Sequence, residues 1–236
     1  MQHEARSERV HDRQLAAIAM IGLFLFVAAF TVAAWLYPGG TWANRAHVGH
    51  SFFGNFLCDL MQPRALNGEP AELSSLFARF GILALSVAHA SFYIQVARLD
   101  DPTSGRARLT RRAGLLACAI SLAIPLVTAD ALHTLHVIIV VAAFVPALLA
   151  TSAAFLICMR SPASTPTIRF LAALTLGVAG FNFLLYAFLY VAYWLGVQLP
   201  RPHLLFLQDL LPQSQRIAII GLVLWILVLS LRRKRA

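Results

Sequence analysis

The sequence predicts an all-α membrane protein, a polytopic bundle of about six transmembrane helices. Of its 236 residues, 59% are hydrophobic and only 12% are charged, about half the charged fraction of a typical soluble domain. The hydrophobic residues gather in six segments. The length of each segment is close to the roughly 20 residues that a helix needs to cross a bilayer. Helices are expected because lipid offers no partner to an unpaired backbone group. A single domain, 1–236, is predicted from this length.

The six predicted spans follow one another with mostly short joints. The first, 15–37, stops at Pro38-Gly39-Gly40, a sequence typical of a turn. It is long and lacks a small-residue cleavage site, so we expect a retained span rather than a removed signal peptide. The other spans are expected at 78–97, 113–129, 135–158, 170–197 and 216–232. Pro125 and Pro146 are expected to kink the third and fourth spans.

Lys and Arg are divided unequally between the two sets of joints. One set holds most of the 19 basic residues, namely Arg6, Arg9, Arg13, Arg98, Arg106, Arg108, Arg111, Arg112, Arg160, Arg169, Arg232, Arg233, Lys234 and Arg235. The other set holds Arg45, Arg64, Arg79, Arg201 and Arg216. Because cytoplasmic joints carry the excess of Lys and Arg, both termini are predicted to be cytoplasmic. This bias accounts for the net charge of +9, and no segment suggests the basic folded face of a nucleic-acid-binding protein.

The longest joint, 38–77, lies on the Arg-poor side and is too long for a simple connection. Within it, the segment 46–61 has polar residues at three- and four-residue steps, namely His47, His50, Ser51, Asn55 and Asp59. Residues at such steps share one face of a helix. A short amphipathic helix on the outer leaflet is therefore predicted for 46–61.

The Arg-poor joints also collect polar side chains into one predicted site. Its members are Asn55, Asp59, Asp130, His133 and Arg216. In a first interpretation these residues form a metal-free network in which Asp59, Asn55, His133 and Arg216 pair with one another, as ionisable groups inside membrane bundles usually do. In another interpretation they simply face water at the membrane surface.

A metal centre is a further interpretation of the same side. His133 and His136 are neighbours on one helix face. Together with Asp59 and His50 they would offer nitrogen and oxygen ligands that suit Zn²⁺. An open position on that ion would activate a water molecule for hydrolysis.

Two polar residues lie deeper in the predicted spans. His89 is halfway along the second span, and an ionisable residue at that depth is a functional candidate, the alternative being a hydrogen bond to a neighbouring helix. Haem held by two histidines would need a second His at that depth, which no other span offers. Asn182 and Tyr186 are expected either to bond a neighbouring helix or to line a cavity.

Three short motifs resemble a family of bacterial membrane proteins. The segment HSFFGNFLCDLMQPRALNGEPAELSSLFARFGILAL contains Asn55, Asp59 and Leu60. Asp130-Ala-Leu-His133 precedes the fourth span, and Gln215-Arg216-Ile-Ala-Ile-Ile precedes Trp225. In this order they are similar to motifs of the DUF998 family, which remotely resembles the Frag1/DRAM/Sfk1 group. Cys58 and Met61 stand where Ser and Gly are usual in that family, and Asp130 only approximates its Pro-Glu pair.

The resemblance implies a six-span, multi-pass protein of the bacterial cytoplasmic (inner) membrane. Its remote relatives imply a membrane lipid as partner, by analogy of fold alone. The predicted function is therefore the binding or handling of a membrane lipid at the polar site, without nucleic acid. A Zn-dependent hydrolase or transferase acting on a lipid is the alternative, and a small-molecule or ion transporter a weaker one. No nucleophile elbow or phosphate-binding loop is present, so no catalytic residue is assigned.

Overall fold

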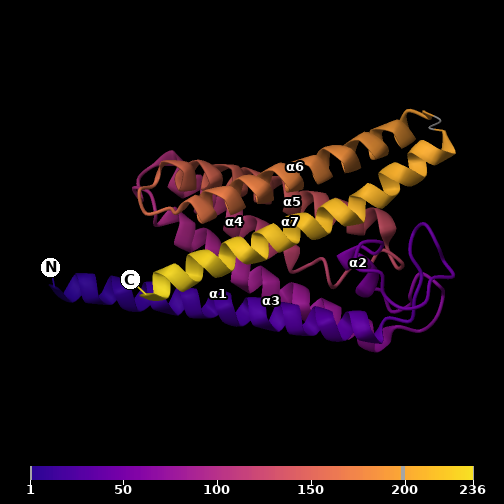
Figure 1. Ribbon diagram of the computed structural model, residues 1–236, viewed down its shortest axis with the longest axis horizontal. Helices are drawn as coiled ribbons and strands as arrows, with labels where there is room; N and C mark the ends of the chain where they lie inside the picture. Colours follow the sequence, from indigo (N-terminus) through magenta and orange to yellow (C-terminus); the bar gives the residue numbers. More distant parts are fainter. Residues whose placement is uncertain (1, 198–199, 236) are drawn as a thin grey trace.

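The computed structural model describes the backbone of residues 2–197 and 200–235, and side chains within 10–197, 200 and 202–232. In this part of the chain the ordered elements are all helices apart from two isolated β-bridges. The helices are α1 (Gln2–Leu36), α2 (Leu57–Leu60), α3 (Glu72–Ala97), α4 (Gly105–Ser121), α5 (His133–Arg160), α6 (Pro166–Trp194) and α7 (Arg201–Arg235) (Figure 1). The predicted all-α class is confirmed.

Five of these helices are long and apolar enough to cross a membrane. The stretches are Val10–Leu36, Glu72–Ala97, His133–Arg160, Pro166–Trp194 and Pro202–Arg232. They correspond to five of the six predicted spans, and the last is longer toward its N-terminus than expected. The helices pack side by side along one long axis (Figure 1), as in a membrane-spanning bundle.

The third predicted span, 113–129, differs from the structure. α4 begins earlier because Ser104 caps it: the Ser104 hydroxyl accepts a hydrogen bond from the N–H of Ala107 at 3.0 Å. It ends at Ser121, and the chain continues to Leu132 mainly as turns. Pro125 has no N–H to donate and disfavours helix at the residue before it. The irregular segment 122–132 then reaches the start of α5 at the far end of the bundle (Figure 1).

The outer-face helix predicted for 46–61 is largely absent within the described residues, since only α2 is helical there. The polar residues bond to their own local backbone instead of continuing a helix. The side-chain oxygen of Asn55 accepts from the N–H of Ser51 at 3.0 Å, a local bond that competes with helix. Gly49 takes a φ of +73°, a left-handed conformation suited to glycine.

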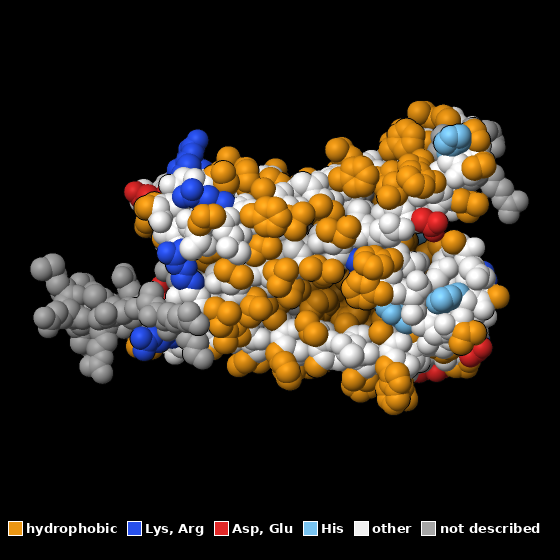
Figure 2. All heavy atoms as spheres, in the orientation of Figure 1, with side chains coloured by type: hydrophobic (Ala, Val, Ile, Leu, Met, Phe, Trp, Pro, Cys, Tyr) orange, Lys and Arg blue, Asp and Glu red, His pale blue; other side chains and the backbone are white. Residues whose placement is uncertain are grey.

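The segments that connect the long helices lie at the two ends of the bundle. The beginning of α1 and the end of α7 lie at one end, whereas residues 37–71, the last part of the segment 122–132 and the end of α6 lie at the other (Figure 1). Figure 2 shows Lys and Arg side chains gathered mainly at the first end and His side chains at the second. In the described part of the chain, the Arg-poor joints therefore lie together at one end of the bundle.

Two clusters of buried side chains hold the bundle together. In the first, the ring of Trp225 meets Phe92 edge-on, with centroids 4.8 Å apart, and Gly114 leaves room for the ring of Tyr93, which an added Cβ would overlap. The second cluster joins apolar side chains of residues 57–71, among them Leu60 and Met61, to side chains of α1 and α3. It holds residues 57–71 against these two helices.

Candidate functional site

Residues 38–71, which we call the cap, are bonded to the first turns of α3 and to the middle part of α7. The Ser75 hydroxyl and the Arg79 Nε both donate to the carbonyl of Met61, at 2.6 and 3.1 Å. The side-chain oxygen of Gln215 accepts from the N–H of Leu57 at 3.0 Å. The cap is therefore a folded part of the bundle and not a loose connection.

Arg216 is the strongest link between the cap and α7. It is 5% exposed, and its Nε donates to the carbonyl of Phe52 at 2.9 Å while its Nη2 donates to the carbonyl of Asn55 at 3.0 Å. The Nη2 also lies 3.4 Å from the Nε2 of His50. Burial, followed by the charge of Arg216, lowers the pKa of His50 to about 4. His50 is thus neutral at pH 7 and can accept from the guanidinium.

Asp59 lies beside this link, and its carboxylate is almost fully buried. It accepts from the N–H of Phe56 at 2.8 Å, the indole N–H of Trp42 at 3.1 Å and the amide of Asn55 at 3.3 Å. Burial raises the pKa of Asp59, and these hydrogen bonds oppose the rise. No described basic side chain forms an ion pair with it.

An elongated cavity of about 520 Å³ opens beneath the cap between α5, α6 and α7. Its wall follows α5 from His133 to Thr151, about 27 Å along a helix axis. Most of the wall is apolar. Polar and aromatic side chains gather at the cap end, namely Trp42, Phe56, Asp59, Gln62, His133, His136, Gln208 and Gln215.

The predicted network forms in part. Asn55 joins its two charged members, because its amide bonds to Asp59 and its carbonyl accepts from Arg216. Asp130 and His133 are both exposed and lie outside this network, although His133 lines the cavity. α5 begins only at His133 itself, and Asp130 lies in the turn before it.

The four predicted metal ligands do not converge. No three His, Cys, Asp or Glu side chains among the described residues could hold one metal ion. His50 faces Arg216, Asp59 accepts three N–H groups, and the Nδ1 of His136 lies 2.6 Å from the carbonyl of Val127. The geometry therefore lends no support to the Zn²⁺ interpretation.

The polar residues that lie deep in the helices contact neighbouring side chains and also line the cavity. The ring of His89 stacks on Tyr93 with centroids 4.4 Å apart, and its Nε2 has no hydrogen-bond partner among the described atoms, so the predicted bond to another helix is not made. The amide of Asn182 donates to the carbonyl of Leu211 and the hydroxyl of Ser214, both at 2.8 Å. His89 and Asn182 both line the cavity, as does Tyr186.

Several residues at the cap end were not predicted from the sequence. Trp42, Phe56, Gln62, Gln208 and Gln215 line the cavity, and the indole of Trp42 also holds Asp59. The position of Gln215 directly before Arg216 was the only local sign of its role. Cys58 also lines the cavity, and burial raises the pKa of its thiol to about 12, so it stays protonated at pH 7.

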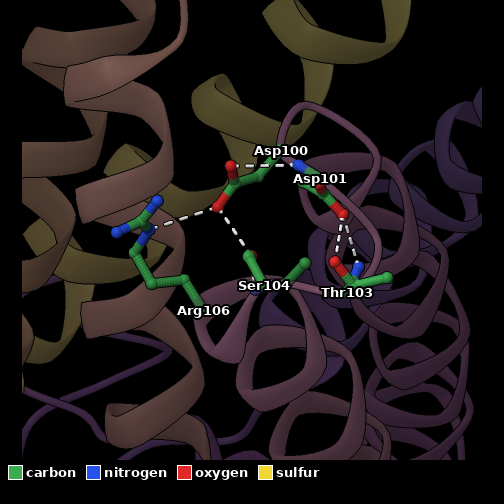
Figure 3. Close-up of polar contacts among 6 residues, drawn as sticks. Asp100, Asp101, Thr103, Ser104 and Arg106 are labelled. Atoms are coloured by element: carbon green, nitrogen blue, oxygen red, sulfur yellow. Dashed lines mark hydrogen bonds and ion pairs between the residues drawn. The ribbon is translucent and has the colours of Figure 1, made fainter.

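A second polar cluster lies at the opposite end, in the joint between α3 and α4 (Figure 3). The carboxylate of Asp100 accepts from the Ser104 hydroxyl at 2.8 Å and the Arg106 Nε at 3.1 Å. Asp101 accepts from the N–H and hydroxyl of Thr103. The Ser104 bond, followed by that of Arg106, lowers the pKa of Asp100. These contacts join neighbours in the chain and shape the start of α4.

No family model matches this chain, and comparisons with curated proteins and with solved structures also find no match. The similarity to DUF998 motifs therefore stays a prediction, and the geometry of the site carries the functional argument.

Proposed function

We propose that this chain is a six-span membrane protein of the DUF998 type that binds a membrane lipid in the cavity beneath its cap. The segment made of α4 and 122–132 would supply the sixth crossing, next to the five long apolar helices. The Arg-rich end would face the cytoplasm, as the positive-inside rule requires, and the cap would face outward.

The cavity is the observation that carries this proposal. Its volume of about 520 Å³ lies within the range of about 300–1,000 Å³ typical of ligand sites. Protein interiors are otherwise close-packed, and even engineered apolar cavities of about 150 Å³ bind apolar molecules. An apolar wall with polar groups at one end matches a molecule that has a hydrocarbon chain and a polar headgroup.

Binding is favoured over catalysis because the described hydroxyl and thiol groups of the cavity lining are not activated as nucleophiles. Among the described residues of the lining, the hydroxyl of Thr151 bonds to Tyr93, the hydroxyl of Thr175 has no hydrogen-bond partner and the thiol of Cys58 is held protonated. An activated nucleophile needs an adjacent base within hydrogen-bond reach, and none of these three residues is bonded to one. The cap-end residues instead hold the cap in place around the cavity mouth.

The proposal is tested by filling the cavity. Ala218 lines it from α7, whereas Ile220 lies on the exposed side of the same helix. In neutral detergent, radiolabelled hexadecan-1-ol should bind the wild type and Ile220→Phe equally, and Ala218→Phe at least about tenfold more weakly, a loss of roughly 1.4 kcal/mol. Equal binding by all three proteins, or no binding by the wild type, would overturn the proposal.

A further inference from the structure

We propose that the cap end of the cavity selects a positively charged amine carried on an apolar chain, with Asp59 as its counter-charge and Phe56 as its aromatic contact. The inference rests on the proposed function and names the chemical class of its ligand.

The charge of the cavity lining points to a cation. Among the described residues that line it, Asp59 is the only Asp, Glu, Lys or Arg. Arg216 is near, but its guanidinium is directed to the carbonyls of Phe52 and Asn55 and is not part of the lining. A phosphate or carboxylate headgroup would meet a like charge at this end, and like-charge juxtaposition strongly disfavours a ligand.

The carboxylate of Asp59 still has room for one more donor. An ionised carboxylate offers about four acceptor positions. Phe56 and Asn55 both bond to Oδ2, whereas Trp42 alone bonds to Oδ1. A buried carboxylate without a directly paired cation is unfavourable. The charge of Arg216 acts on Asp59 from nearby, but no described basic side chain forms an ion pair with it. A ligand ammonium group would supply a further donor and a directly paired charge.

The aromatic side chains at this end suit the same ligand. Phe56 and Trp42 line the cavity beside Asp59, and Tyr186 lines it from α6. Aromatic faces attract ammonium groups through the ring quadrupole. The guanidinium of Arg45 already lies 5.0 Å from the ring centroid of Trp42, so the ligand's aromatic contacts are assigned to Phe56 and Tyr186.

His133 and His136 also line this end of the cavity, and neither is a Lys or Arg with a permanent positive charge. His133 is exposed. His136 is bonded to the carbonyl of Val127 through Nδ1. His50 faces Arg216 and is neutral at pH 7 because its pKa is lowered to about 4. Asp130 and Asp209 are exposed at the same end and add negative charge near the cavity.

The experiment compares ligands that share one hydrocarbon chain and differ in headgroup. Purified full-length protein in neutral detergent at neutral pH is titrated with hexadecylamine, hexadecan-1-ol and hexadecanoate. We expect the amine to bind at least about tenfold more tightly than the alcohol, and hexadecanoate to bind most weakly.

Asp59→Asn removes the charge while keeping the volume. It should abolish the preference for the amine over hexadecan-1-ol, so that the ratio of the two affinities falls to about one. Asp209→Asn is the matched control, since it removes an exposed carboxylate outside the described lining, and it should keep the preference. An unchanged preference in Asp59→Asn would overturn the inference.

A measurement on the wild type alone covers the case in which Asp59→Asn does not fold. N-hexadecylacetamide keeps the chain and the nitrogen but carries no charge, so it should bind at least about tenfold more weakly than hexadecylamine. Equal affinities for the amine, alcohol and amide would overturn the amine selectivity while leaving lipid binding intact. If none of these chains binds, the proposed function itself fails.

Discussion

Arginine side chains at the two ends of the bundle sit in opposite surroundings. At the cap end, Arg216 is 5% exposed and bonds to backbone carbonyls more than 160 residues away in the chain. At the other end, the side chains of Arg98 and Arg106 are each 36% exposed and pair with Asp12 and Asp100.

The comparison distinguishes charged side chains that stabilise the fold from charged side chains that orient the chain in the membrane. A hydrogen bond from a charged group to a buried carbonyl contributes about 1.5–3 kcal/mol, whereas an exposed ion pair contributes about 0–1 kcal/mol. The basic end thus has charges suited to orienting the chain in a membrane. The cap end has charges that hold distant segments together.

The largest effect is expected for Arg216→Met. It leaves the carbonyls of Phe52 and Asn55 without their donor, and should lower the free energy of unfolding by about 2–4 kcal/mol. The matched control is Arg64→Met, which removes an exposed cap arginine and should change stability by less than about 1 kcal/mol. Denaturant unfolding in detergent provides the measurement, and equal losses in both variants would contradict the comparison.

A double-mutant cycle measures whether Asp59 and Arg216 stabilise the cap together. Asp59 and Arg216 meet through Asn55, so Asp59→Asn and Arg216→Met should show a coupling energy above about 0.5 kcal/mol. Additive losses would mean that the two charges stabilise the cap independently.

An intermediate, pH-dependent effect is expected from His50. Its pKa is lowered from 6.5 to about 4 in the folded protein, so the unfolded chain binds the proton first as the pH falls. Its contribution to stability is therefore present above pH 6.5 and is lost as the pH falls from about 6.5 to about 4. The raised pKa of Asp59 acts in the opposite direction.

His50→Gln isolates the histidine from the carboxylate. Unfolding of the variant, followed from pH 7 to 4, should lose less stability than unfolding of the wild type over that interval. The control is His47→Gln on the same cap. Parallel curves for the wild type and His50→Gln would show that His50 is not kept neutral by its surroundings.

The smallest effect is expected at the basic end. Asp100→Asn weakens the contact with Arg106 and keeps an acceptor for the Ser104 hydroxyl, so the free energy of unfolding should change by less than about 1 kcal/mol. A loss as large as that of Arg216→Met in the same unfolding assay would erase the contrast between the two ends.

The sequence alone predicted the helical class, the gathering of Arg-poor joints at one end and six spans, five of which correspond to long apolar helices. These features depend on runs of apolar residues and on which joints carry Arg, and both can be read along the chain. The start of α4 was missed, although Ser104 offered a local capping signal, because the apolar run begins a few residues later.

Tertiary structure alone decided the cap and the cavity. The polar stripe of 46–61 suggested a helix, but Asn55 forms a turn with Ser51 and offers its carbonyl to Arg216. Side-chain periodicity reveals which residues are polar and not which backbone carbonyls a distant arginine will reach. The cavity likewise arises where α5, α6 and α7 leave space beneath the cap, and such a space depends on how the helices pack together rather than on the sequence of any one of them.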